Sequence, residues 1–194
     1  MSNLTIGKIA NNSVTLVLSS QTTAVSPVEV HADSAGNPNH ADFSLTLPNL
    51  VGFPHKSRCL CHIESITAVV SPALSPGVGV IGVVIEGMAP HKVFRNGGEH
   101  GYVGFLTLKS SAVSDDDDNT DVSMCGETFT ASGDIITNGV MCQSPFGKRI
   151  RVRCYNATTH TLLTGVAGNV FLTGQPVVLK LKLLFLDNDD MKDF

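Results

Sequence analysis

The sequence predicts an all-β protein, an antiparallel two-sheet sandwich that is most economically a single jelly roll. The first observation is composition, because the 194 residues include 22 Val and 33 Ser or Thr but only 5 Glu and 12 Ala, which favours strands over helices. The second is the pattern, in which apolar residues alternate or form short blocks bounded by Gly, Pro, Asn and Asp. With 42% hydrophobic residues and a net charge of −4, the composition also excludes wholesale disorder. The length favours one domain over residues 1–194.

Eight to eleven short strands follow from this alternation, with turn-forming clusters such as 34–38 and 144–147 between them. The strands are expected at residues 14–19, 25–31, 42–47, 59–70, 79–87, 102–109, 134–137, 150–155, 161–163, 169–172 and 177–186. Many short strands with long connections are typical of a sandwich of jelly-roll type.

Two of these strands combine an apolar face with a basic one. In the segment 148–154 arginines alternate with apolar residues, and in 177–186 lysines alternate with leucines that are expected to line the core. Guanidinium groups bind carboxylates or phosphates through two hydrogen bonds, so these faces are candidate contacts for an acidic partner; the alternative is a solvated outer face. The candidate interface residues are Lys148, Arg149, Arg151, Arg153, Lys180 and Lys182.

One acidic stretch interrupts the alternation. Residues 110–130 include five aspartates, four of them consecutive, and are expected to form a long exposed loop. Neither this run nor the acidic C-terminal stretch has the spacing of an EF-hand calcium loop, so no calcium site is predicted.

No catalytic residue, cofactor or metal ligand is predicted. Cys59 and Cys61 would face one side of a strand and His62 the other, so these three side chains cannot form a tetrahedral site by themselves. The chain has no G-x-S-x-G motif and no phosphate-binding glycine loop. The glycines of 77–87 are expected at bulges or close contacts within the sheet.

The cellular compartment and the class of partner follow from weaker signals. Five scattered cysteines fit free thiols in a reducing environment, and the opening residues resemble no secretory signal. Sequons occur at Asn3, Asn11 and Asn156, and their use stays open. No run is long enough to span a membrane, and the basic surplus outside the acidic stretches is too small to favour direct nucleic-acid binding.

Three segments carry a family resemblance. They are Asp-Phe-Ser-Leu-Thr-Leu-Pro-Asn-Leu at 42–50 leading into 59–70, the pair 83–88 and 104–108, and the pair 150–155 and 181–187. In this order they resemble the small single jelly-roll capsid proteins of eukaryotic double-stranded DNA viruses, virophages and polinton-like elements, which serve as penton or minor capsid proteins.

The resemblance implies a structural virion component that acts through protein–protein interfaces in an icosahedral shell and is assembled in the host cytoplasm or nucleus. Its implied partners are further copies of the chain, in a homo-oligomer such as a pentamer, and other capsid proteins. Two alternatives remain. A carbohydrate- or receptor-binding sandwich would have to work without Trp and with only Tyr102 and Tyr155, and a cupin-like enzyme would need a paired H-x-H motif that the chain lacks.

Overall fold

The computed structural model describes residues 12–24, 27–49, 58–69, 80–88, 93–95, 98–108, 126–130, 139–163 and 176–185, and their regular structure is nearly all β. The strands are β1 (Ser13–Ser19), β2 (Val28–Ala32), β3 (Pro38–Thr46), β4 (Arg58–Val69), β5 (Val80–Glu86), β6 (Val93–Arg95), β7 (Gly98–His100), β8 (Tyr102–Leu108), β9 (Gly126–Thr130), β10 (Val140–Gln143), β11 (Arg149–Asn156), β12 (Thr161–Leu162) and β13 (Val177–Phe185). Among these residues, no helix has the length and apolar character needed to cross a bilayer.

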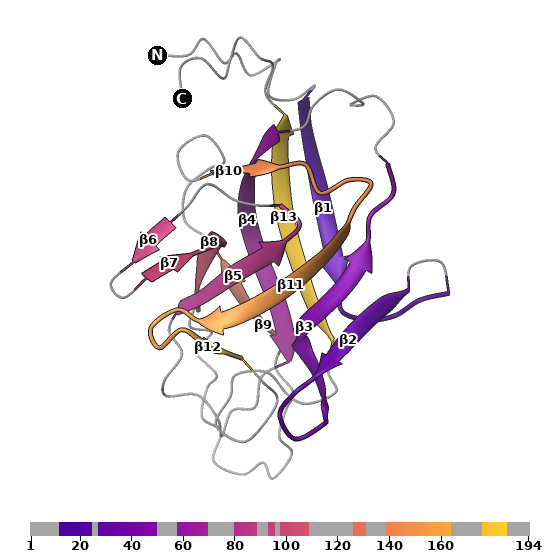
Figure 1. The fold of residues 1–194 in the computed structure, drawn as a ribbon, viewed down its shortest axis with the longest axis vertical. Helices are drawn as coiled ribbons and strands as arrows, with labels where there is room; N and C mark the ends of the chain where they lie inside the picture. Colours follow the sequence, from indigo (N-terminus) through magenta and orange to yellow (C-terminus); the bar gives the residue numbers. More distant parts are fainter. Residues whose placement is uncertain are drawn as a thin grey trace.

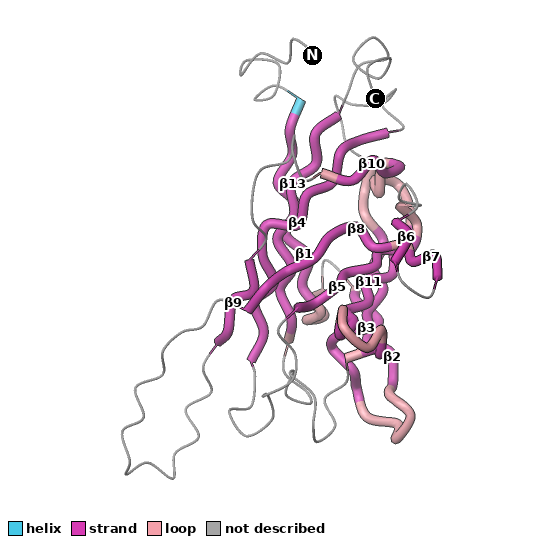
Figure 2. Tube along the Cα trace, turned by 90° about the vertical axis from the view of Figure 1, so that its left-hand side faces the viewer, coloured by secondary structure: helices cyan, strands magenta, loops and turns pink. Residues whose placement is uncertain are grey.

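Eleven of the strands form two antiparallel layers, which confirms the predicted sandwich, and β6 and β7 pair with each other in a separate sheet (Figure 1). The rear layer has the order β1-β13-β4-β9, with β10 beside the first part of β4. The front layer has the order β8-β5-β11-β3-β2, with the short β12 added to β11. Figure 2 shows the two layers from the side. This strand order is compatible with a jelly roll.

The two sides of the sandwich differ. On one side β9 pairs with both β4 and β8, so the hydrogen-bonded path passes from the rear layer into the front layer. On the other side the path ends at β1 in the rear layer and at β2 in the front layer. We call this second side, formed by β1 and β2, the open side.

The core lies between the layers and follows the predicted alternation. In β13, Leu179, Leu181 and Leu183 are buried while Lys180 is exposed, so the predicted core face is confirmed. In β11, Ile150, Val152 and Cys154 are buried and the arginines between them are not. Leu45, Phe43 and Ala41 of β3 complete the opposite wall. This division of faces is the reason that each basic residue of β11 and β13 lies on the outside.

Several element boundaries differ from the sequence prediction. β3 begins at Pro38, inside a segment that looked like a turn, because its first residues pair with the end of β2. β10 was not predicted, and β9 was wrongly included in the loop 110–130, of which its five residues form a strand. The predicted strands 134–137 and 169–172 and the run of aspartates lie outside the described residues.

Candidate functional site

The best-defined polar contact of the front layer joins Arg151 of β11 to Asp42 of β3. Nε and Nη2 of Arg151 donate to the two oxygens of the Asp42 carboxylate, both at 2.7 Å. The Asp42 side chain is only 5% exposed, whereas that of Arg151 is 36% exposed. The hydrogen bonds from Arg151 to Asp42 raise the pKa of the guanidinium. A carboxylate this deep requires a charged partner, so Arg151 serves the fold directly.

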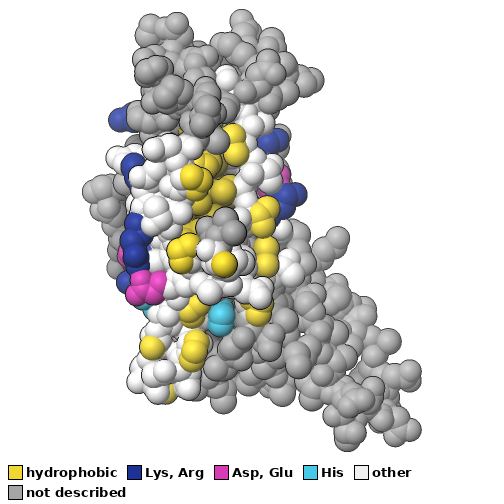
Figure 3. Space-filling model, turned by 90° about the vertical axis from the view of Figure 1, so that its right-hand side faces the viewer, with side chains coloured by type: hydrophobic (Ala, Val, Ile, Leu, Met, Phe, Trp, Pro, Cys, Tyr) yellow, Lys and Arg dark blue, Asp and Glu magenta, His cyan; other side chains and the backbone are white. Residues whose placement is uncertain are grey.

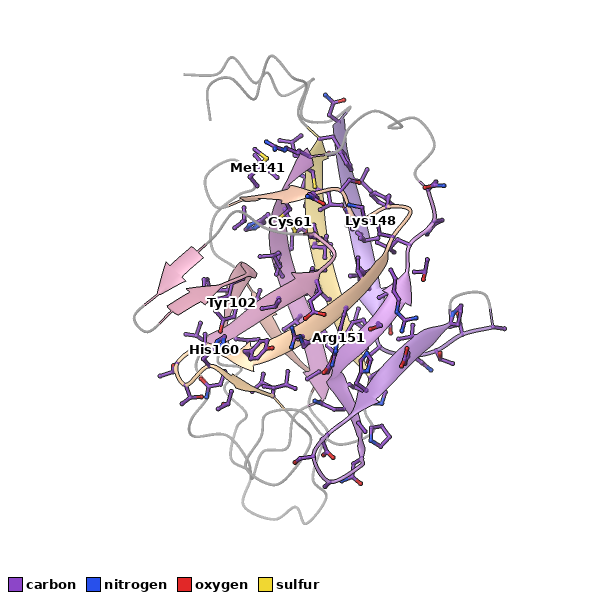
Figure 4. The ribbon with its side chains drawn as sticks, viewed as in Figure 1. Cys61, Tyr102, Met141, Lys148, Arg151 and His160 are labelled. Atoms are coloured by element: carbon purple, nitrogen blue, oxygen red, sulfur yellow. The ribbon has the colours of Figure 1, made fainter. Side chains whose placement is uncertain are left out.

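Two further arginines of β11 have partners on other strands. Arg149 forms an ion pair with Glu29 of β2, and Arg153 forms one with Glu86 of β5. Together with the Arg151–Asp42 pair, they form a row that we call the arginine ladder. Figure 4 shows Arg151 at its centre on β11. The ladder connects β11 to β2, β3 and β5, and each of its positive charges faces a carboxylate of the same chain.

The three candidate lysines lie apart from one another. Lys180 on the rear layer forms an ion pair with Glu64, at 2.9 Å between Nζ and Oε2. Lys182 lies opposite His62 in the pairing of β13 with β4. Lys148, next to β11, donates to Gln143 at 3.2 Å. The six candidate interface residues therefore lie on two outer faces and do not form one patch.

A cluster of aromatic rings, absent from the sequence prediction, lies at the end of the front layer. The hydroxyl of the buried Tyr102 is hydrogen-bonded to Nδ1 of His160. The ring of His160 stacks on Tyr155 with the centroids 5.0 Å apart and the planes 7° from parallel. Phe105 packs against Tyr102 at 4.9 Å. Figure 4 shows Tyr102 and His160 near each other at this end.

Gly82 of β5 provides the space for this cluster. A Cβ at position 82 would lie 2.4 Å from the ring of Tyr102, so only glycine leaves room for the ring at this place. His160 has a φ of 58°, a left-handed conformation that non-glycine residues rarely adopt. The local backbone thus holds the rings of the cluster in a specific arrangement. It could not be predicted from the sequence, because Tyr102 lies 58 residues before His160 in the chain.

One arginine of the arginine ladder contacts the aromatic cluster. The guanidinium carbon of Arg153 lies 5.8 Å from the centroid of the Tyr155 ring, within the range of a cation–π contact. Burial raises the pKa of the Tyr155 phenol, so this group is neutral at physiological pH. Arg153 therefore connects the arginine ladder to Tyr155 and, through it, to the exposed His160.

A serine, a histidine and a glutamate meet on β2 and β3. Nε2 of His31 lies 2.8 Å from the hydroxyl of Ser44, and its Nδ1 lies 4.0 Å from a carboxylate oxygen of Glu29. In an acyl-transfer enzyme such a set needs main-chain N–H groups that bind the oxyanion. Ser44 is buried in β3, which pairs with β2 on one side and with β11 on the other. The main-chain groups of this segment are therefore already used in hydrogen bonds between strands. We assign this set to the cohesion of the front layer.

The cysteines gather more closely than the sequence indicated. Cys142 of β10 lies directly opposite Cys59, and a hydrogen bond with Cys142 together with burial raises the pKa of Cys61. Burial also raises the pKa of Cys59 and of the separate Cys154 to about 12. These four cysteines are free and buried, as predicted. Within the described ranges, no group of three or more His, Cys, Asp or Glu side chains could hold a metal ion.

Comparison with known proteins does not assign this chain to a family. No protein-family model matches the chain, and no curated protein is significantly similar to it.

Proposed function

We propose that this protein is a structural component of a viral shell, a penton or minor capsid protein that acts through protein–protein interfaces. The observation that carries the proposal is the strand order, with β1-β13-β4-β9 facing β3-β11-β5-β8, which is compatible with a jelly roll. The three segments that resemble capsid proteins correspond to β3 and β4, to β5 and β8, and to β11 and β13, which are strands of these two layers.

The construction of the front layer supports a mechanical role. A shell protein must keep its shape under load from its neighbours, and the arginine ladder joins four strands of this layer by ion pairs. Beneath it, the apolar side chains of β3, β5 and β11 are almost completely buried. The layer is therefore held together on both of its faces, and the free edges remain for contacts with other chains.

The test is the mass and symmetry of the purified full chain, measured by native mass spectrometry and negative-stain electron microscopy. We expect oligomers of closed rotational symmetry, such as pentamers, or incorporation into particles when the chain is co-expressed with a major capsid protein. A chain that stays monomeric and is excluded from particles would contradict it.

The aromatic cluster favours a second candidate, a carbohydrate- or receptor-binding module. Both tyrosines of the chain lie in this cluster, where Tyr155 stacks with the exposed His160 beside Arg153. Sugars bind to flat rings that are flanked by hydrogen-bonding groups. A glycan array probed with the wild-type chain and with Tyr155→Ala distinguishes the candidates. Saturable binding that this substitution abolishes favours the module, and the absence of binding counts against it.

A further inference from the structure

The open side of the sandwich ends in two strands of different character. Among the described strands, β1 pairs only with β13 and β2 pairs only with β3. An edge strand directs about every second N–H and C=O group away from its sheet, toward any strand that approaches. Both edges could in principle accept another strand, so their side chains decide which of them does.

The edge at β2 carries features that oppose strand addition. Its register shifts between Val30 and His31, which marks a bulge, and its outer face carries Glu29 and His31. Bulges and charged side chains are the usual means by which proteins block edge-to-edge pairing.

The edge at β1 lacks these features. Its seven residues, Ser13–Ser19, contain no charged residue and no proline, and it pairs with β13 without a register shift. Val17 on its outer face is 60% exposed, the largest exposed fraction among the large apolar residues of the described chain. A straight, uncharged, apolar edge of this length is well suited to bind another strand.

Apolar side chains also line the gap between the two edges. Val14 and Leu16 of β1 and Val28 and Val30 of β2 are only partly buried while packing against the core. Figure 3 shows this side of the molecule, where a band of hydrophobic side chains runs between flanking Lys and Arg. A strand that extends the rear layer beyond β1 would cover this band with its inward side chains.

We propose that the β1 edge binds the β1 edge of a second copy, in an antiparallel pair centred on Leu16. This register places Ser13 opposite Ser19, Val14 opposite Leu18 and Thr15 opposite Val17 of the other copy. Residues directly opposite in an antiparallel pair share a face of the sheet. The core-facing apolar side chains of the two copies would therefore contact each other.

The charges of the chain permit this pairing. β1 contributes none, so no like charges lie opposite each other. The nearest lysines, Lys180 and Lys182, lie on β13, one strand further in. Across the pair they are separated from their counterparts by three strand spacings, roughly 14 Å, which exceeds the Debye length of about 8 Å in physiological salt.

The partner is thus an identical chain related by a two-fold axis. The inference rests on the proposed structural role in one respect only. A shell requires contacts between copies, and that role gives this contact its purpose. A two-fold pair is also distinct from the five-fold contact of a penton. The two proposals can therefore fail separately, because one is measured as dimer mass and the other as ring symmetry or particle incorporation.

The experiment compares the wild-type chain with Val17→Lys and Phe105→Lys in sedimentation velocity over a range of protein concentrations. Val17 and Phe105 are the two exposed large apolar residues of the described chain, but Phe105 lies on β8, away from the open side, where it pairs with Gly82 of β5 and lies two residues before the part of β8 that pairs with β9. We expect a wild-type dimer, a dimer dissociation constant roughly tenfold or more higher for Val17→Lys, and little change for Phe105→Lys. Circular dichroism checks that both variants remain folded.

A second measurement tests the register. In a Thr15→Cys/Val17→Cys variant, each new thiol should lie opposite one of the other copy, so mild oxidation with oxidised glutathione should yield covalent dimers. A Phe105→Cys variant treated in the same way should stay monomeric in denaturing gels. A wild-type chain that remains monomeric at high concentration, equal dimerisation by the two lysine variants, or no cross-linking of the double cysteine variant would each overturn the proposal.

Discussion

The outer face of the front layer and the edge at β1 differ in how their surface groups are satisfied. On the front layer, Arg149, Arg151 and Arg153 point outward, and each reaches a carboxylate on another strand of the same layer. On the β1 edge there is no charge, and an apolar side chain is exposed at its centre. The charges of the front face are therefore paired within one chain, whereas no second strand among the described residues covers the β1 edge.

This difference shows that a row of arginines does not by itself mark an interface. A guanidinium that already binds a carboxylate must give up that bond before it binds a partner, and the carboxylate it leaves must be solvated again. An edge strand gives up only bound water. We therefore assign cohesion to the arginine ladder and association to β1.

The largest expected effect concerns the rear layer that supports β1. Leu181 of β13 is fully buried beside β1, so Leu181→Ala should lower the free energy of unfolding by about 2–5 kcal/mol. Val17→Ala, on the exposed face of the next strand, should change it by less than about 0.5 kcal/mol. Urea denaturation of the two variants measures this contrast. Equal losses would mean that Val17 is packed as a core residue and that the edge is not free.

The central pair of the arginine ladder should give the next largest effect. Asp42→Ala and Arg151→Ala should each lower the free energy of unfolding by about 1–3 kcal/mol, because each leaves a partly or fully buried charge without its partner. In a double-mutant cycle measured by urea denaturation, the coupling energy should be about 1–2 kcal/mol. Strictly additive losses would break the distinction between a cohesive face and an associating edge.

The Arg149–Glu29 pair provides a weaker version of the same test. Both side chains are more than half exposed, at 62% and 58%, so water and salt screen their interaction. Arg149→Ala should cost less than about 1 kcal/mol of unfolding free energy, and added salt should remove most of that cost. A loss as large as that of Arg151→Ala would show that burial does not determine how much each ion pair of the arginine ladder contributes to the free energy of unfolding.

The smallest effect is a pH dependence where the two layers meet. The hydroxyl of Ser20, which follows β1, lies 2.9 Å from Nδ1 of His40 on β3 and accepts a hydrogen bond from Val177 N at 2.8 Å. Burial lowers the pKa of His40 below its ordinary value of 6.5, so the folded state prefers the neutral ring. The contribution of the neutral His40 ring to the free energy of unfolding is therefore fully present above pH 6.5. It is lost as the pH falls from there through the lower pKa of the folded state.

Thermal unfolding across this range of pH measures the effect. His40→Gln should flatten the acid side of the curve, because glutamine has no proton to bind. A variant curve with the same acid slope as the wild type would assign the pH dependence to other groups.

Most of the fold could be predicted from the sequence, because a strand with one buried face must alternate. The core faces of β11 and β13 and the position of β4 follow from that rule alone. β10 was missed because its four residues, Val-Met-Cys-Gln, are too few to show an alternation. The first residues of β3 were missed because Pro-Asn-His is typical of turns, and only the pairing with β2 makes them a strand.

The candidate site could be predicted only in part. The alternation correctly placed the arginines of β11 on an outer face, but it could not reveal Asp42, Glu29 and Glu86 as their partners. Those pairs depend on which strands are neighbours, and the order β5-β11-β3-β2 joins segments more than a hundred residues apart. The exposed edge at β1 was likewise invisible, because an edge is defined by the absence of a neighbouring strand.

Hydrogen–deuterium exchange at low and high protein concentration compares the two regions in one measurement. We predict that amides of β1 exchange more slowly at high concentration, because a second copy covers them, while amides of β11 exchange at the same rate at both concentrations. Protection that rises with concentration at β11 and stays constant at β1 would contradict the assignment of cohesion to the arginine ladder and association to the β1 edge.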